Sequence, residues 1–416
     1  SHKPPAPTTP TQERTEVRQV TYTPPSQVAA NFLTVVKKII KKLFVIPLAL
    51  VSPLQKLSIS TIKKYWKFLL VIIILLAAFL RLYRIDSYLN FLGDEGRDVM
   101  VVRNILHGDL TFLGPRSSAG DFYLGPVYYY LMAPFLFLSN YHPVGPAIMV
   151  ALFAIATVYL IYRIGSEFFN KNAGTIAALL YAISPLVIIH SRSSWNPNVM
   201  PFFSTAALYS AYRGIERNNL YLLGLSGVLL GIAMQLHYLT IFLGGVLFVY
   251  ILLVELLNSE RTNRLFGLFK KYITIFIGFI LGFSPFLLFE IKHGFPNTRT
   301  ISDFILSSGD VSVGGKFSEI IKDVFFRIFG RLVTAYPVPE TVSIIEEMPI
   351  AIWYYLTLIL AFLSIALIVY QLFQRLNEKS ECRGILLIIL WFGLGVLFFG
   401  LYKKPIYDYL FTFMFP

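Results

Sequence analysis

Long apolar runs recur along most of this 416-residue chain and constrain its fold more than any other feature. A helix of roughly 17–25 apolar residues is long enough to cross a bilayer. Nine runs meet or approach this length, near residues 66–85, 143–164, 173–190, 198–213, 220–236, 238–257, 272–290, 350–373 and 385–402. The sequence therefore predicts an all-α polytopic membrane protein with a bundle of about nine transmembrane helices.

The charge content supports a membrane protein and argues against several soluble classes. Only 14% of the residues are charged, whereas soluble domains average about 25%. The formal net charge is +13, and much of it flanks the apolar runs, where it sets topology and attracts anionic lipid rather than nucleic acid. Cys382 is the single cysteine of the chain, which excludes an intramolecular disulfide and a cysteine-cluster metal site.

The N-terminal region divides into two segments that precede the first span. Residues 1–30 are rich in proline, threonine and charge, and we expect a disordered tail. Residues 31–65 contain a stretch with lysines on one side of a helical wheel and apolar residues on the other, as in a basic amphipathic helix on a membrane surface. A surface helix packed on protein is the alternative. Residues 66–416 are expected to form one transmembrane module, and its end within a hydrophobic run is consistent with a C-terminal truncation.

Lysine and arginine are concentrated in alternate loops, which predicts the orientation of the chain. The pattern describes a multi-pass plasma membrane protein with a cytoplasmic N-terminus and two large outer loops, 86–142 and 291–349. This orientation requires that the apolar run 126–138 does not span, so we interpret it, like 94–107, as an interfacial helix of the first outer loop. In the second outer loop, a Gly/Ser stretch suggests a mobile lid and precedes an amphipathic helix near 317–332.

The unusual polar residues gather on the outer side of this topology. Asp94 and Glu95 are adjacent carboxylates, and Arg97 follows two residues later, just beyond the first span. Ionisable groups kept beside a membrane are candidates for function because they are costly there. Further candidates for an outward cavity, from the same loop and from three later outer segments, are Asp121, Tyr128, Arg192, Asn196, His237 and Tyr407.

These residue types suit the transfer of a sugar from a lipid phosphate to a hydroxyl. A carboxylate, Asp94 or Glu95, would take the proton of the attacking hydroxyl as a general base. The departing phosphate needs neutralisation of charge more than a proton, and the planar guanidinium of Arg97 or Arg192 can hold its oxygens. A second acid, Asp121, keeps a hydrolase open as an alternative. No metal site or cofactor is predicted, although Asp94 and Asp121 could share a weakly held divalent cation.

The candidate residues also have structural interpretations. Adjacent Asp94 and Glu95 can cap a helix, since carboxylates are favourable in a first turn. Arg97 can form a structural bridge with Asp94, and Arg192 can anchor a loop in the headgroups. His237 can be a satisfied polar residue at a helix end.

Five segments together form a specific combination. The first span ends in LRLYRI, GDEGRD follows, and GDFYLGPVYYYLMAP comes after a variable loop. A two-span unit ending AALLYAISPLVIIHSR and the segment GIAMQLHYLT complete the pattern. Over roughly residues 66–257 the chain thus resembles the GT-C superfamily, specifically its family-39-like branch of protein O-mannosyltransferases, aminoarabinose transferases and bacterial relatives. Relatives often continue beyond the point equivalent to Pro416.

The resemblance implies a GT-C fold and an inverting transferase that takes a monosaccharide from a polyprenyl-phosphate donor on the outer face. The acceptor would be a hydroxyl of a glycan, a lipid or a protein. The catalytic Asp of the family maps onto Asp94, and the phosphate-contacting Arg of some members maps onto Arg97. This sequence departs from the family pattern at two places, which bear on phosphate binding and on any role of a metal. Gly125 stands where some relatives have a lysine, and Asn196 and Asn198 stand where some have a second acid.

Two other classes of function are alternatives. A lipid-linked glycan transporter or flippase would place charged residues along a path through the spans, whereas the middles of these spans are almost uncharged. An inactive scaffold of a cell-envelope complex would differ from an enzyme only in an activity test.

Overall fold

A computed structural model describes residues 65–117, 121–257, 264–306, 317–332, 348–375, 382–400 and 406–416 of the chain. Within these ranges the regular secondary structure is helical and no strand forms, in agreement with the all-α prediction. An isolated antiparallel bridge joins Arg116 and Tyr123. The expected tail, all but the last residue of the expected amphipathic segment and the Gly/Ser stretch of the second outer loop lie outside the described residues.

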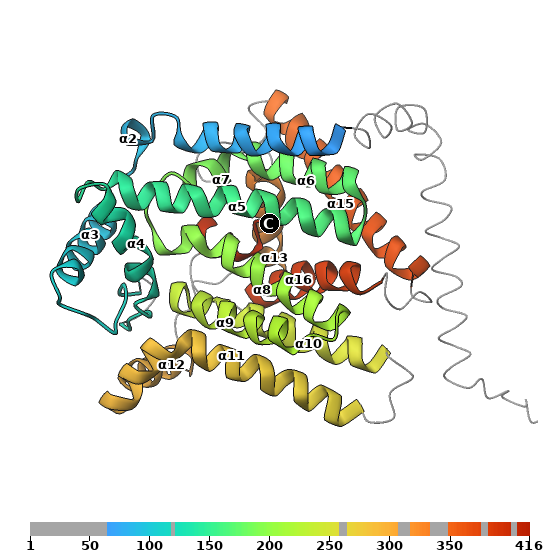
Figure 1. The fold of residues 1–416 in the computed structure, drawn as a ribbon. Coiled ribbons are helices and arrows are strands. Elements are labelled where there is room, and N and C mark those ends of the chain that lie inside the picture. The colour runs from blue at the N-terminus through green and yellow to red at the C-terminus, as the bar shows by residue number, and fades with distance from the viewer. Residues whose placement is uncertain are drawn as a thin grey trace, which may run out of the picture. The chain divides into compact units, whose positions relative to one another are not determined.

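Most of the helices follow one another through short turns (Figure 1). In chain order they are Tyr65–Leu82, α2 (Ile85–Tyr88), α3 (Gly93–Leu106), α4 (Val127–Leu138), α5 (Val144–Phe168), α6 (Lys171–Ile183), α7 (Pro185–His190), η1 (Asn196–Val199), α8 (Met200–Glu216), α9 (Leu220–Leu236), α10 (Thr240–Leu257), α11 (Arg264–His293), α12 (Pro296–Leu306), α13 (Phe317–Phe326), η2 (Arg327–Arg331), α15 (Met348–Arg375), α16 (Cys382–Gly400) and η3 (Asp408–Met414). The short elements η1 and η3 are 3-10 helices, and η2 is a π-helix.

Six of the described helices are long and apolar enough to cross a membrane: Tyr65–Leu82, α5, α10, α11, α15 and α16. The other three expected spans are present as shorter helices. The run 173–190 forms α6 and α7, of 13 and 6 residues, and α8 and α9 have 17 residues each. In the bundle, α6 packs against α5, and α9 packs against both α8 and α11. The chain is therefore an integral membrane protein built as a helical bundle.

Glycine allows α9 and α11 to approach closely. Gly227 and Gly231 on α9, and Gly278 and Gly282 on α11, are each spaced by four residues and so lie on one face of their helix. A Cβ at any of these four positions would lie only 2.1–2.4 Å from a backbone oxygen of the other helix. In a membrane, where apolar surface gives no hydrophobic driving force, such close backbone packing holds helices together.

Arg81 joins the first helix to the break between α6 and α7. Pro185 has no N–H, so the carbonyl of Tyr181 loses the donor that a continuous helix would supply. The buried guanidinium of Arg81 donates to this carbonyl at 3.3 Å and to that of Ala182 at 2.9 Å. Ser184 begins the new helix, since its Oγ accepts a hydrogen bond from the N–H of Val187. A charged side chain near the end of the first span thus stabilises the fold.

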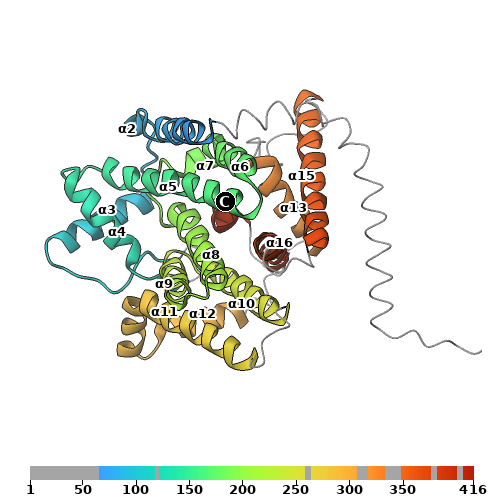
Figure 2. The same cartoon turned by 45° about the vertical axis from the view of Figure 1, so that its right-hand side comes forward.

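The segment 86–142, which is expected to form the first outer loop, contains helices. Its two expected interfacial helices are present as α3 and α4, which pack against each other and lie side by side at one end of the bundle (Figures 1 and 2). The helix expected near 317–332 is present as α13 followed by η2, and α15 lies beside η2 and α16.

The two segments expected to form the outer loops are joined by a hydrogen bond at the start of α12. The Oδ1 of Asn297 accepts a hydrogen bond from the backbone N–H of Tyr123 at 2.8 Å. The Glu290 carboxylate in turn accepts hydrogen bonds from the backbone and side chains of Asn297 and Thr298. A carboxylate is favourable there because helix N-termini carry unpaired N–H groups. These contacts hold the segment before α4 against α12.

Candidate active site

The start of α3 carries both predicted catalytic carboxylates, and one of them is engaged in holding the helix. Glu95 is 6% exposed, and its Oε2 accepts a hydrogen bond from the N–H of Leu92 at 3.0 Å. This contact is one half of a capping box. Its Oε1 accepts a hydrogen bond from Ser193 Oγ at 3.0 Å. Glu95 therefore stabilises the start of α3 and ties it to the turn that follows α7.

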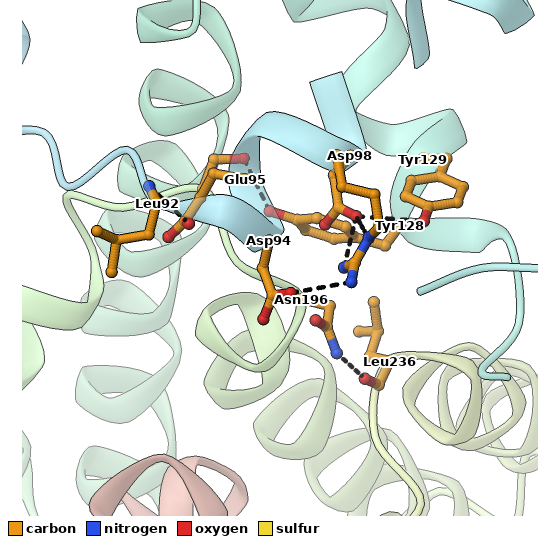
Figure 3. Close-up of polar contacts among 10 residues, drawn as sticks. Leu92, Asp94, Glu95, Asp98, Tyr128, Tyr129, Asn196 and Leu236 are labelled. Atoms are coloured by element: carbon orange, nitrogen blue, oxygen red, sulfur yellow. Dashed lines mark hydrogen bonds and ion pairs between the residues drawn. The ribbon is translucent and has the colours of Figure 1, made fainter. Parts of the chain in front are cut away.

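Asp94 points away from Glu95 and toward Asn196 (Figure 3). Its side chain is 51% exposed, which leaves the carboxylate accessible to a ligand. Arg97, one turn further along α3, donates from Nη1 to Asp94 Oδ1 at 2.9 Å. The predicted base and the predicted phosphate-binding cation are therefore direct neighbours on one face of the helix.

A third acidic residue, Asp98, lies directly beneath this pair and was missed by sequence reasoning. Its side chain is fully buried, and Oδ1 accepts hydrogen bonds from Arg97 Nε at 3.0 Å, Arg97 Nη2 at 2.8 Å and the Tyr129 hydroxyl at 3.2 Å. Burial raises the pKa of Asp98 to about 6, although the cation of Arg97 acts in the opposite direction. The four-residue spacing from Asp94 in GDEGRD was the available signal, because such residues share a helix face.

A small pocket opens beside these residues and gathers groups from distant parts of the chain. Asp94 and Arg97 line it together with two other predicted residues, Asn196 and His237. Arg116 adds a second cation to the lining. This pocket therefore brings together part of the predicted set of residues.

Asn196 and His237 shape the side of the pocket opposite α3. Asn196 Nδ2 donates to the backbone carbonyl of Leu236 at 2.6 Å, which satisfies the last turn of α9. His237 is buried, and burial lowers its pKa to about 4, so its imidazole is neutral at pH 7. Its Nδ1 accepts a hydrogen bond from the N–H of Leu239 at 3.3 Å. A neutral histidine held in this way can donate to a ligand from Nε2.

Three aromatic residues complete the pocket, and sequence reasoning identified none of them as site residues. They are Trp195, Tyr238 and Tyr409. The rings of Trp195 and Tyr409 pack with their centroids 4.6 Å apart. Tyr407, which was predicted to line the cavity, is instead 55% exposed and stacks on Tyr409. Tyr409 rather than Tyr407 lines the pocket, and only tertiary contacts determine which of the two does so.

An ion-pair cluster fixes the position of Tyr409. The neighbouring carboxylate of Asp408 accepts from Arg327 Nη1 at 3.1 Å and from Arg331 Nε at 2.8 Å. Both arginines belong to the π-helix η2, and π-helical turns often occur at functional sites. The second outer loop thereby supports one wall of the pocket.

Four predicted residues do not line the pocket with Asp94. Arg192 donates to the carbonyls of Leu80 at 3.1 Å and Tyr83 at 2.7 Å, and so caps the end of the first helix. Asp121 is largely exposed and pairs with Arg116 at 2.6 Å. Tyr128 is fully buried, with its hydroxyl 2.9 Å from Ser194 Oγ, and Tyr407 is exposed as described above. Their functional roles stay predictions, but the contacts of Arg192 are those of a helix cap.

The departures from the family pattern have physical counterparts in the structure. A Cβ at Gly125 would lie 2.3 Å from Cγ of Gln235, so a lysine side chain has no room at this position. Gln235 in turn donates to the carbonyl of Gly282 at 2.6 Å. Among the described residues, no group of three or more His, Cys, Asp and Glu side chains could hold a metal ion.

Two solved structures of an oligosaccharyltransferase from Archaeoglobus fulgidus are similar to this chain over most of its length. One shows archaeal oligosaccharyltransferase AglB in complex with an inhibitory peptide and a dolichol-phosphate, with a TM-score of 0.52 and 17% identity over 85% of this chain. The other shows the apo form, with a TM-score of 0.51 and 15% identity, also over 85%. The chain spans 49% of the length of each. The shared fold is that of the GT-C class of membrane glycosyltransferases.

Within this class, a family model described as dolichyl-phosphate-mannose-protein mannosyltransferase matches residues 124–289. The matched range contains the turns at Asn196 and His237 but not the segment with Asp94 and Arg97. A search of curated protein sequences found no match. The family model thus covers less than half of the chain, and the similar structures agree with it in showing a GT-C type of fold.

Proposed function

We propose that this chain is an inverting glycosyltransferase that moves a monosaccharide from a polyprenyl-phosphate donor to a hydroxyl acceptor. The observation that carries the proposal is the arrangement on α3. A half-exposed carboxylate, Asp94, faces a pocket, and the guanidinium of Arg97 lies 2.9 Å from it. A base and a phosphate-binding cation are the two groups that this reaction requires.

The reaction would proceed as a single displacement. The acceptor oxygen attacks the anomeric carbon and forms a new C–O bond, while its proton passes to the Asp94 carboxylate. The bond between the anomeric carbon and the phosphate oxygen breaks, and the polyprenyl phosphate leaves with the electron pair. Arg97 would neutralise the negative charge on this phosphate. Because attack and departure occur on opposite faces of the sugar carbon, the configuration inverts.

An apolar cavity supports a lipid-linked donor. It has a volume of about 590 Å³ and lies among α9, α10, α11 and α16, with Leu230, Gly244 and Phe279 in its lining. Thr240 and Ile241 also line it, and they follow His237 and Tyr238 of the polar pocket within four residues. A lipid chain in the cavity would therefore place its phosphate near the polar pocket. The dolichol-phosphate bound to the archaeal oligosaccharyltransferase is consistent with such a donor.

We further propose that the site faces the extracytoplasmic side of the plasma membrane. The distribution of Lys and Arg among the short loops supports this orientation. The acceptor hydroxyl would belong to a glycan, a lipid or a protein. The names of the matched family and of the similar structures favour a protein acceptor for those proteins.

Transfer in proteoliposomes tests the proposal. Purified protein is incubated with radiolabelled polyprenyl-phosphate sugars and with glycan, lipid and peptide acceptors, and the labelled product is identified. Asp94→Asn should reduce the rate of transfer by about 10²–10⁴-fold, because a positioned general base contributes a factor of this size. Asp109→Asn removes a carboxylate from an exposed position of the same loop and serves as the matched control.

Two results would contradict the proposal. Near-normal turnover by Asp94→Asn would remove Asp94 from the role of base. Movement of the labelled lipid across the bilayer without any transfer of sugar would instead support the flippase alternative.

A further inference from the structure

We infer, on the basis of the transferase function proposed above, that Asp98 is a positioning residue for donor binding. It holds the guanidinium of Arg97 at the edge of the pocket, so that the donor phosphate can displace Asp94 from Arg97 without moving Arg97 itself. The base would thereby become free only when the donor is bound.

The geometry of Arg97 carries the first step. Asp98 Oδ1 accepts from both Nε and Nη2 of Arg97, at 3.0 and 2.8 Å, which fixes the plane of the guanidinium. Among the described residues, Asp94 accepts one hydrogen bond, from Nη1 at 2.9 Å (Figure 3). Arginine has five N–H donors, so two remain for a ligand while both acids are bound. Asp98 therefore holds one edge of Arg97 and leaves the other for the pocket.

Accessibility separates the two acids. The Asp94 side chain is 51% exposed and that of Arg97 is 38% exposed, whereas Asp98 is fully buried. A phosphate that enters the pocket can compete with Asp94 for Nη1, because both are acceptors at the exposed edge. It cannot reach the contacts with Asp98. The exchange of partners would leave Asp94 without its cation and ready to accept the proton of the acceptor.

The burial of the charged Asp98 side chain lowers the stability of the folded protein. The second oxygen of Asp98, Oδ2, is buried and has no hydrogen-bond partner within the part of the chain that the structure describes. An unpaired polar atom in the protein interior is unfavourable. The hydroxyl of Tyr129 on α4 is its other donor, at 3.2 Å. A neutral residue would satisfy a purely structural role at this position, whereas the alignment of a guanidinium needs the carboxylate.

Kinetics of transfer by Asp98→Asn test the inference. The Asn variant keeps the shape but loses the charge-assisted contacts that align Arg97. The donor KM should therefore rise about tenfold or more, which corresponds to about 1.4 kcal/mol of affinity. The kcat should fall by a smaller factor. Tyr129→Phe should shift the donor KM in the same direction by less, and Asp109→Asn should leave both parameters unchanged.

The pH profile separates positioning from a structural role. The ionisable groups that face Asp98 are Asp94 and Arg97 on α3 and Tyr128 and Tyr129 on α4. Arginine and the tyrosines do not titrate near neutral pH, whereas burial raises the pKa of Asp98 to about 6. The donor KM of the unaltered protein should rise as the pH falls through about 6, because protonated Asp98 loosens its hold on Arg97. In Asp98→Asn the donor KM should be high throughout and lack this rise.

A binding assay distinguishes failure of this inference from failure of the proposed function. The probe is farnesyl monophosphate, a short polyprenyl phosphate, with farnesol as the control for the lipid alone. Weaker binding of the phosphate to Asp98→Asn, with unchanged binding of farnesol and an unchanged melting temperature, supports the inference.

Three results would overturn it. An unchanged donor KM and phosphate affinity in Asp98→Asn, with normal transfer by the unaltered protein, would refute the role of Asp98 alone. A failure of the unaltered protein to transfer sugar or to bind the phosphate would refute the proposed function and this inference together. A large fall in the melting temperature of Asp98→Asn, with no change in the donor KM of Tyr129→Phe, would show that Asp98 is structural.

Discussion

Consecutive side chains of an α-helix point about 100° apart, and at the start of α3 this angle separates the tasks of two adjacent carboxylates. Asp94 is directed into the pocket, while Glu95 is directed back to Leu92 and across to Ser193. Arg97 follows one turn later and pairs with both Asp94 and the buried Asp98. Four residues thus provide a ligand-accessible acid, a helix cap, a cation and a buried partner for that cation.

Substitution of Glu95 tests this separation at the scale of single residues. Glu95→Gln should lower the melting temperature by a few degrees, because a first-turn charge and a hydrogen bond contribute about 1 kcal/mol each. The kcat for transfer should stay within about tenfold of the original value, far less than the loss expected for Asp94→Asn. Differential scanning fluorimetry and the transfer assay provide the two measurements.

Ser193→Ala is the matched control for Glu95, since it removes the other partner of the same contact. It should lower the melting temperature to a similar degree and leave the kcat near its original value. If Glu95→Gln lost transfer at an unchanged melting temperature, Glu95 would have a catalytic role and not the role of a helix cap.

At the scale of elements, the contact between α9 and α11 positions one side of the pocket. The close approach at Gly231 and Gly282 brings Gln235, on the last turn of α9, into hydrogen-bonding distance of α11. The turn that follows α9 carries His237 and Tyr238, which line the pocket. The glycines between α9 and α11 therefore help to determine the position of the turn that carries His237 and Tyr238.

Gly231→Ala should disturb this pairing. The added methyl group would lie 2.4 Å from the carbonyl oxygen of Phe279, so the helices must separate and the melting temperature should fall by several degrees. Gly224→Ala, on the same helix, adds a methyl group 3.8 Å from Thr274 and should leave the melting temperature equal or higher, since alanine favours helix over glycine by about 1 kcal/mol. Equal melting temperatures for both variants would contradict the close packing.

At the scale of the whole molecule, segments that connect the helices meet around the pocket. The first outer loop contacts α12 through Tyr123 and Asn297, and η2 holds Asp408 next to Tyr409 of the pocket. The pocket is therefore assembled by segments that are separated by up to about three hundred positions in the sequence. The membrane-embedded helices supply the fixed frame on which these segments meet.

Cysteine accessibility tests the predicted orientation of this frame. In a Cys382→Ser background, a cysteine at Asp109, in the first outer loop, should react with a membrane-impermeant maleimide in intact cells. A cysteine at Arg217, in the turn between α8 and α9, should react only after the cells are opened. Both sites are exposed in the structure, so a difference in their labelling would show that the membrane shields one of them from the reagent. The opposite labelling pattern would place Asp94 in the cytoplasm and refute the proposed site.

The sequence by itself determined the class of fold and most of the helices. Apolar runs and helix-start signals act over a few turns of chain, so the bundle, α3 and α4 could be predicted without tertiary contacts. The segment that holds the candidate base was also evident, since carboxylates are rare beside a membrane. The length of each span was less predictable: Pro185 divides 173–190 into two helices, and Arg81, from a distant helix, donates to carbonyls at the break.

Only the tertiary structure decided which side chains share the pocket. The sequence could not separate Tyr407 from Tyr409, or show that Arg192 caps the first helix, because both depend on contacts with segments far away in the chain. The burial of Asp98 beneath Arg97 likewise requires α4, since Tyr129 covers it. Local patterns set whether a residue lies in a helix and which medium surrounds that helix. The rotation of each helix about its axis, and hence each side chain's partners, is set by packing between distant elements.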